Sequence, residues 1–237
     1  MVGILARSRG SAALNGIPRS TIHELRTPLT AIRGYAQLLL RGVKSPEQAQ
    51  RAYETIFHES ERLAGMLNQL SKVAEATLGT VEVTPTRFDL AQLTSAAVEP
   101  ARARWPEHTF VHRAGPSVEV VADPRSVSEV LSSLLDNAAG FSSPASRIET
   151  WVGSDERQAC VAVRDRGIGI PPEELELVFE CFWRGSNVAQ AGPRTSRGLG
   201  VGLFLARAAA TLAGGRIRAE SELNRGSTFH LVLPLAP

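Results

Sequence analysis

The sequence predicts two domains of different fold class, an antiparallel helical hairpin followed by an α+β sandwich. Up to about residue 78, apolar residues recur at alternating three- and four-residue steps, which is typical of helices packed in a bundle. Farther along the chain, short alternating segments typical of strands are mixed with helical segments. Gly79 and Pro85 interrupt the helical pattern, so the domain boundary is expected near residue 82.

The composition narrows the class of protein. The 237 residues are 43% hydrophobic and 21% charged, which is ordinary for a folded globular chain. The net charge is +2 and the signs are evenly mixed, so no basic stripe is expected and nucleic acid is not an expected partner. Cys160 and Cys181 lack metal-ligand spacing and are interpreted as buried thiols in a reducing compartment. No apolar run approaches the ~18 residues that span a bilayer, so we expect a cytoplasmic chain, with membrane attachment only through a segment outside this sequence.

Two helices are predicted in the first domain. The first covers residues 19–40, and the second follows a break at Gly42 and runs to about Leu78. Because two helices cannot enclose a core, the simplest completion is a four-helix bundle with a second copy of the chain, which predicts a homodimer. The predicted segments are an N-terminal extension or linker, the hairpin and the second domain, at residues 1–18, 19–82 and 83–237.

The second domain is predicted as a mixed sheet with helices packed on one face. Asp123 and the following proline are typical of a helix start. The last two strands are expected to form a hairpin across residues 224–226. Helices are expected at residues 89–104, 124–139 and 203–213, and strands at 110–113, 118–122, 147–152, 159–164, 215–219 and 228–233.

The first candidate for chemistry is His23. It lies one step off the apolar seam of its helix, so its imidazole is expected to face solvent, where a nitrogen can reach an incoming phosphate. Glu24 can orient the ring or accept its proton, which raises nucleophilicity. Pro28 removes a backbone hydrogen bond one turn later and is expected to bend the helix, a costly feature that usually has a functional reason.

In the second domain, three groups of residues suit a nucleotide. Asp165 ends a strand and is followed by Gly167 and Gly169, so an acceptor carboxylate can meet the exocyclic amine of adenine while the backbone turns tightly. A glycine-rich segment, residues 198–202, precedes a helix whose N-terminal amides can bind phosphate oxygens. Asn137 offers a neutral oxygen that suits Mg²⁺.

The order of these segments resembles that of the sensor histidine kinases of two-component systems, from about Thr21 to Pro234. His23 lies in a segment similar to the family's phosphoacceptor motif, and five further segments resemble its nucleotide-binding motifs in the expected order. The six segments are HELRTPLT (23–30), VLSSLLDNA (130–138), DRGIGI (165–170), FECFWR (179–184), GLGVGL (198–203) and GSTF (226–229). The resemblance implies a HisKA-type dimerisation and phosphoacceptor hairpin followed by a Bergerat-type (GHKL/HATPase_c) ATP-binding sandwich.

The resemblance also implies an activity and a set of residue roles. The chain is expected to phosphorylate His23 with ATP and Mg²⁺ and to pass the phosphoryl group to an aspartate of a response regulator receiver domain, with regulator phosphatase activity as a second reaction. Thr27, one turn from His23, is expected to align a water for that phosphatase reaction, and Asn137 to hold the metal. The implied catalytic residues are His23, Glu24, Thr27 and Arg184. The implied ATP-binding residues are Asn137, Phe141, Asp165, Gly167, Gly169, Ile170, Arg184, Arg197, Gly198, Leu199, Gly200, Val201, Gly202, Leu203 and Thr228, with a lid over residues 185–197.

Three positions depart from the family pattern. Ser133 stands where a second Asn is frequent, Gly140 where Lys or Arg is frequent, and Phe141 where Tyr is frequent. Because Gly140 offers no charge to the phosphates, nucleotide affinity is expected to be low. Two alternatives therefore stay open: a weak or inactive kinase that acts as a phosphatase or docking scaffold, and, more remotely, an ATP-driven clamp of the GHKL class.

Overall fold

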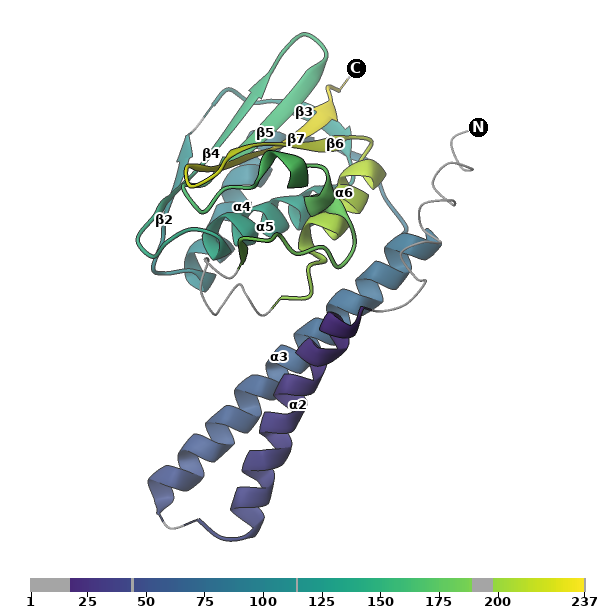
Figure 1. Ribbon diagram of the computed structural model, residues 1–237. Helices are drawn as coiled ribbons and strands as arrows, with labels where there is room; N and C mark the ends of the chain where they lie inside the picture. The colour runs from purple at the N-terminus through teal and green to yellow at the C-terminus, as the bar shows by residue number, and fades with distance from the viewer. Residues whose placement is uncertain (1–17, 44, 114, 189–197, 237) are drawn as a thin grey trace. The chain divides into compact units, whose positions relative to one another are not determined.

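The computed structural model describes residues 18–43, 45–113, 115–188 and 198–236. The chain divides into two compact units, Met1–Thr80 and Val81–Pro237 (Figure 1). Each unit is considered by itself below. No helix in the described ranges is both long and apolar enough to cross a membrane.

The first unit is a helical hairpin, as predicted. Helix α2 (Arg19–Leu40) packs against helix α3 (Pro46–Leu78). Ser45 caps the start of α3 by accepting a hydrogen bond from the backbone N–H of Gln48, and Gly79 ends α3 in the left-handed conformation. Large apolar side chains remain exposed on both helices of the single chain, among them Ile22, Leu29, Tyr35, Leu38, Tyr53, Phe57 and Leu67.

In the described residues, the second unit is a sandwich of a five-stranded mixed sheet and three α-helices. The sheet has the strand order β2-β4-β5-β7-β6, and only the β2–β4 pair is parallel. Helices α4, α5 and α6 cover one face of this sheet (Figure 1), which confirms the predicted fold class. The strands are β2 (Thr109–Arg113), β4 (Arg147–Ser154), β5 (Gln158–Arg164), β6 (Arg216–Glu222) and β7 (Gly226–Pro234), and the helices are α4 (Leu90–Arg104), α5 (Pro124–Gly140) and α6 (Gly202–Leu212).

One predicted strand belongs to a different sheet from the one expected. Strand β3 (Glu119–Ala122) pairs with β1 (Thr86–Asp89) in a separate two-stranded antiparallel sheet. Strand β1 has no predicted counterpart, because its four residues, TRFD, are mostly polar and show no apolar alternation. Two short 3₁₀ helices, Pro172–Glu174 and Leu177–Phe179, also lie where no element was predicted.

The two cysteines are free thiols, but they are partly buried where buried thiols were predicted. Burial is still sufficient to raise the pKa of Cys181 to about 11 and to raise the pKa of Cys160 as well. Both side chains are therefore protonated thiols at neutral pH rather than thiolates.

The side chain of Asp123 forms hydrogen bonds both to the start of α5 and to Thr84, which precedes β1. Its Oδ1 accepts hydrogen bonds from the N–H groups of Arg125 (2.7 Å) and Ser126 (3.1 Å), which confirms the predicted cap, and its Oδ2 accepts from Thr84 N–H (2.9 Å). The bond from Thr84, assisted by the other two, holds the pKa of Asp123 below its usual value.

We expect Asp123→Ala to lower the free energy of unfolding by about 2 kcal/mol, because the cap is lost and buried N–H groups are left unpaired. Thermal melting of the full chain at neutral pH measures the loss. A carboxylate with a lowered pKa stabilises the fold above its unfolded-state pKa and ceases to do so as the pH falls through its folded-state pKa. The difference between wild type and variant should therefore shrink toward acidic pH, and a constant difference would contradict this account.

Candidate functional site

His23 is exposed on α2, as its offset from the apolar seam predicted. Helix α2 continues from Arg19 to Leu40 through Pro28, which is buried. The Thr27 hydroxyl donates a hydrogen bond to the backbone carbonyl of His23 (3.1 Å). Because this bond occupies the hydroxyl hydrogen, Thr27 must break it before it can donate to a water molecule.

Glu24 contacts the opposite helix of the hairpin. Its Oε2 lies 3.4 Å from Nη2 of Arg62, a residue of α3 that the sequence analysis did not single out. The two residues are 38 positions apart, and only the register of the folded hairpin places them together. The surroundings of His23 therefore include a cation from the second helix.

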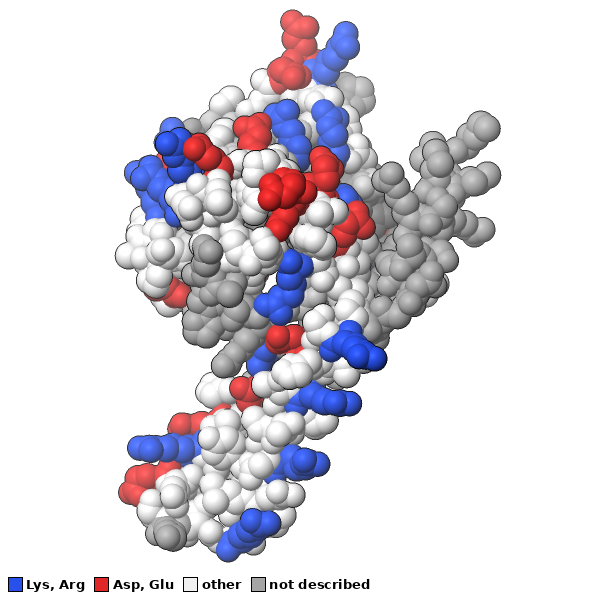
Figure 2. All heavy atoms as spheres, in the orientation of Figure 1, with Lys and Arg blue, Asp and Glu red and all other residues white. Residues whose placement is uncertain are grey.

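His23 also shares a face of α2 with three arginines. Arg19, Arg26 and Arg33 recur every seven residues and are exposed, and His23 follows Arg19 by four positions. Figure 2 shows blue atoms spaced along one edge of the hairpin, while red and blue atoms are mixed along its other edge and over the rest of the face in view. The expectation that the chain has no basic stripe was therefore wrong for α2, because the even charge balance of the whole sequence does not report which residues share a helix face.

Asp165 is the buried carboxylate of the second unit, with 3% of its surface exposed. Its Oδ1 accepts hydrogen bonds from the backbone N–H groups of Gly167 (2.8 Å) and Ser227 (3.2 Å). Burial raises the pKa of Asp165 to about 6 against the lowering effect of these bonds. Both bonds end on the same oxygen, so Oδ2 remains able to accept a hydrogen bond from a ligand.

Gly167 brings the end of α5 against the turn that follows Asp165. A Cβ atom on Gly167 would lie 2.2 Å from the carbonyl oxygen of Phe141, so no other residue fits there without movement of the backbone. Ile168 N–H also donates to that carbonyl (3.2 Å). The structure thus brings together Phe141, Asp165 and Gly167, three of the predicted ATP-binding residues.

Helix α5 is joined to the start of α6 by Ser133. The Ser133 hydroxyl donates to the carbonyl of Gly202 (2.9 Å), the first residue of α6. Asn137 lies one turn after Ser133 and therefore on the same side of α5. Its side chain makes no hydrogen bond to any described residue, so its amide oxygen can accept a metal ion, and a neutral oxygen suits Mg²⁺ when phosphates supply the charge.

The N-terminus of α6 has no side-chain cap among the described residues. Val201 occupies the cap position, so the first amides of the helix, those of Gly202 and Leu203, are suited to bind a ligand. The side chains of Leu199 and Val201 are buried, which leaves only their backbone for a nucleotide.

Gly200 connects this turn to the segment that precedes the lid. It adopts a left-handed conformation (φ 72°), and a Cβ atom there would lie 2.4 Å from the carbonyl oxygen of Trp183 and 3.1 Å from Cγ of Arg184. Arg184 therefore lies beside the glycine-rich segment. Arg197, the other predicted lid arginine, falls outside the described residues, as do positions 189–197 of the predicted lid.

The first residues of the lid are held by contacts that the sequence analysis missed. Asn187 Nδ2 donates to the carbonyl of Gly169 (2.9 Å), and Ser186 N–H donates to the buried carboxylate of Glu174 (3.2 Å to each oxygen). The Ser221 hydroxyl accepts a hydrogen bond from Ile170 N–H (2.8 Å) and is hydrogen-bonded to the hydroxyl of Ser227. The N–H of Ser227 in turn donates to Asp165. No local motif marks these residues, because each contact joins segments far apart in sequence.

Thr228 lies on β7, directly opposite Arg164 and thus next to the strand end that carries Asp165.

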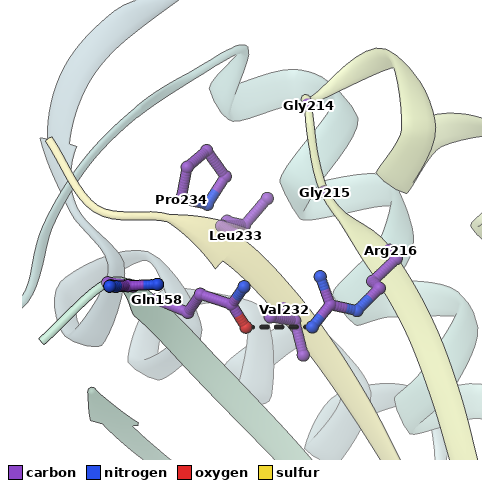
Figure 3. Close-up of a pocket in the computed structure, with 8 residues that line it drawn as sticks. Gln158, Gly214, Gly215, Arg216, Val232, Leu233 and Pro234 are labelled. Carbon is purple, nitrogen blue, oxygen red and sulfur yellow. Dashed lines mark hydrogen bonds between the residues drawn. The ribbon is translucent and has the colours of Figure 1, made fainter. Parts of the chain in front are cut away.

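A small hollow of about 120 Å³ lies elsewhere, at the start of β6 and the end of β7 (Figure 3). There Arg216 donates to Gln158 across β7 (2.9 Å). The hollow is lined by Arg157, Gln158, Gly214, Gly215, Arg216, Val232, Leu233 and Pro234, none of which is a predicted ATP-binding residue.

The fold and the site together define a class of protein, in which a helical hairpin that exposes a histidine is followed by a sandwich with a buried carboxylate and a helix N-terminus without a side-chain cap. Residues 20–77 match the His Kinase A (phospho-acceptor) domain, and residues 122–237 match the histidine kinase-, DNA gyrase B- and HSP90-like ATPase domain. The chain therefore belongs to the sensor histidine kinases of two-component systems, as the resemblance of its motifs implied.

Individual relatives agree with this assignment. Sensor histidine kinase YkoH of Bacillus subtilis (strain 168) is 32% identical over 206 residues, which are 86% of this chain and 44% of the relative. Histidine kinase ThkA in complex with response regulator TrrA has a similar fold (TM-score 0.75, 21% identity, 98% of this chain and 64% of that one). ShkA in complex with AMPPNP is also similar (TM-score 0.66, 23% identity, 90% and 44%). The chain spans less than half the length of the curated relative.

Proposed function

We propose that the Val81–Pro237 unit binds Mg-ATP, that His23 accepts its γ-phosphoryl group, and that the phosphoryl group then passes to an aspartate of a response regulator. One observation carries the proposal. A single chain combines a HisKA hairpin whose His23 is exposed with an ATPase sandwich whose Asp165 is buried and has one oxygen left for a ligand. The AMPPNP complex of ShkA supports a nucleotide in the second unit. Because ATP is a cytoplasmic substrate, we place both units in the cytoplasm.

Nucleotide binding follows from the chemistry of the site. The Asp165 carboxylate accepts a hydrogen bond from the exocyclic amine of adenine. The amides at the start of α6 donate to phosphate oxygens, and the positive end of the helix dipole favours the phosphate charge there. Asn137 holds Mg²⁺, which when bound neutralises charge on the phosphates. Arg184 stabilises the charge on the transferred group.

Phosphoryl transfer begins when an imidazole nitrogen of His23 attacks the γ-phosphorus in line with the bond to ADP. A nitrogen–phosphorus bond forms and the bond between phosphorus and the bridging oxygen breaks, so that ADP leaves with the electron pair. Glu24 accepts the proton from the other imidazole nitrogen, which keeps the attacking nitrogen nucleophilic.

The hairpin supports a homodimer. Large apolar side chains stay exposed on both α2 and α3, and a second copy of the chain can cover them in a four-helix bundle. Light scattering should report twice the mass of one chain, and a monomer that persists across concentrations would contradict the bundle.

The arginine row on α2 supports a receiver domain as the acceptor, because the phosphoryl-accepting site of a receiver is acidic. Arg19, Arg26 and Arg33 lie on the face that carries His23, so an acidic partner would be steered to the phosphoacceptor. The complex of ThkA with TrrA supports a regulator as partner. Phosphotransfer to the regulator should accordingly slow as ionic strength rises.

The proposed function is tested by incubating the dimer with radiolabelled Mg-ATP. We expect acid-labile, base-stable label in wild type and no label in His23→Gln. Absence of label in wild type, with the regulator still dephosphorylated or bound, would favour the alternative of a phosphatase or scaffold. The departures from the family pattern at Ser133 and Gly140 are the features that favour this alternative. The Ser133 hydroxyl is engaged in a hydrogen bond to the Gly202 carbonyl, and Gly140 offers no charge to the phosphates.

A further inference from the structure

We infer that Ser221 is a positioning residue for adenine recognition, because its hydroxyl fixes the peptide group that holds the Asp165 carboxylate. The inference rests on the proposed function, in which Asp165 accepts a hydrogen bond from the exocyclic amine of adenine. Ser221 itself belongs to β6 and lies outside the motifs that the sequence analysis singled out. It acts on the nucleotide only through Asp165.

The hydroxyl of Ser221 is bonded to three partners in the described part of the chain. Its oxygen accepts a hydrogen bond from the N–H of Ile170 (2.8 Å), and its hydrogen is donated to the carbonyl of Gly226 (3.0 Å). The hydroxyl of Ser227, directly opposite on β7, lies 2.9 Å away. Because a serine hydroxyl has one hydrogen and two lone pairs, these partners use its full capacity and fix its orientation.

One of these bonds controls a donor to Asp165. The Gly226 carbonyl and the Ser227 N–H belong to the same peptide group, and that N–H donates to Oδ1 of Asp165 (3.2 Å). The group is planar and trans, so its carbonyl and its N–H point in opposite directions. When Ser221 anchors the carbonyl, it also sets the direction of the N–H. The carboxylate that binds this N–H is thereby held with its second oxygen available to the base.

Ser221 also holds the far end of the turn that follows Asp165. Ile170 is five residues beyond Asp165, and its bond to Ser221 ties the turn to β6. Between these points, a Cβ atom on Gly169 would lie 2.2 Å from the carbonyl oxygen of Glu222. The turn therefore packs against β6 without space for a side chain, and Ser221 acts on both of its ends.

Loss of the Ser221 hydroxyl should loosen this arrangement without opening the fold. Two backbone hydrogen bonds still join the turn to the hairpin of β6 and β7. One runs from the N–H of Asn224 to the carbonyl of Ile168 (2.8 Å), and the other from the N–H of Asp165 to the carbonyl of Ser227 (2.9 Å). The expected defect is a misaligned carboxylate in a folded domain.

The test measures the affinity of the full chain, with Mg²⁺, for ATP and for purine riboside triphosphate, an analogue without the exocyclic amine. Ser221→Ala should weaken ATP binding roughly three- to tenfold, the usual worth of one hydrogen bond. Its affinity for the analogue should stay within about twofold of wild type, because the analogue offers no amine to Asp165. General damage to the domain would instead weaken both nucleotides alike.

Two variants serve as controls. Ser221→Thr keeps the hydroxyl on a residue that strands favour, so it should bind both nucleotides as wild type does. Thr211→Ala on α6 removes a hydroxyl that donates to the carbonyl of Arg207 on the same helix (2.9 Å), and it should also match wild type. Circular dichroism checks that each variant remains folded.

Carboxyl NMR titration of the nucleotide-free chain tests the positioning without a ligand. The bond from Ser227 N–H lowers the pKa of Asp165, which burial raises to about 6, so Ser221→Ala should raise this pKa further. An unchanged pKa, an unchanged affinity for ATP, or equal losses for ATP and the analogue would overturn the inference. Wild type that binds no ATP would overturn the proposed function, and the titration would still decide whether Ser221 orients Asp165.

Discussion

Asp165→Asn should abolish detectable ATP binding and at the same time stabilise the nucleotide-free protein. The asparagine can keep its oxygen where Oδ1 accepts from Gly167 and Ser227, but it then presents an amide donor where Oδ2 was. The asparagine amide and the exocyclic amine of adenine are both donors, so they cannot form a hydrogen bond with each other and both would be buried without a partner. We therefore expect the affinity for ATP to fall by about 100-fold or more.

The gain in stability follows from the raised pKa. Burial lifts the pKa of Asp165 from 3.8 to about 6, so the folded state binds this proton more tightly than the unfolded state does. The associated stability is fully present below the unfolded-state pKa and is lost as the pH rises through the folded-state pKa. Above that pH the ionised carboxylate costs the apo domain up to about 3 kcal/mol, and a neutral asparagine avoids this cost.

Thermal melting of the nucleotide-free protein tests this expectation. The variant should melt above wild type by a few degrees at pH 8, and the difference should shrink as the pH falls from 6 toward 4. Asp155→Asn is a matched control, because Asp155 Oδ1 also accepts two backbone N–H groups but is exposed. It should leave the affinity for ATP unchanged, and because hydrogen bonds lower the pKa of Asp155 where burial raises that of Asp165, it should not raise the melting temperature at pH 8. A variant at Asp165 that binds ATP, or that melts below wild type at pH 8, would refute the account.

Thr27→Ala should slow dephosphorylation of the regulator by about tenfold or more while His23 is still phosphorylated at a rate close to wild type. The hydroxyl lies one turn beyond His23, too far along the helix to assist attack on ATP, but on a face where it can align a water molecule for attack on the aspartyl phosphate. In the structure it donates to the carbonyl of His23, so the phosphatase reaction requires it to rotate toward the water.

Two controls separate the hydroxyl from the local helix. Thr27→Ser keeps a hydroxyl and should keep most of the phosphatase activity. Thr55 on α3 makes the same kind of bond, to the carbonyl of Arg51 (2.8 Å), so Thr55→Ala removes a matched helix contact and should leave both activities unchanged. Loss of His23 phosphorylation in Thr27→Ala with phosphatase activity retained would contradict the assignment of Thr27 to water positioning.

The order of the motifs and the two periodicities were sufficient to predict the hairpin, the sandwich and the family. Each of these signals lies within a few neighbouring residues: the seam of α2, the cap at Asp123, and the glycines that follow Asp165. Local patterns of this kind determine backbone conformation and the buried face of each element, because they act over one or two turns. The sequence also predicted correctly that His23 faces solvent.

Tertiary structure alone decided which distant groups meet. Ser133 reaches Gly202 across 69 positions and Arg62 reaches Glu24 across 38, and the partner of β3 is a polar strand that shows no alternation. The raised pKa of Asp165 likewise depends on the burial that the whole sheet and its helices impose. These features depend on register and packing between elements, which the residues of one segment do not encode by themselves.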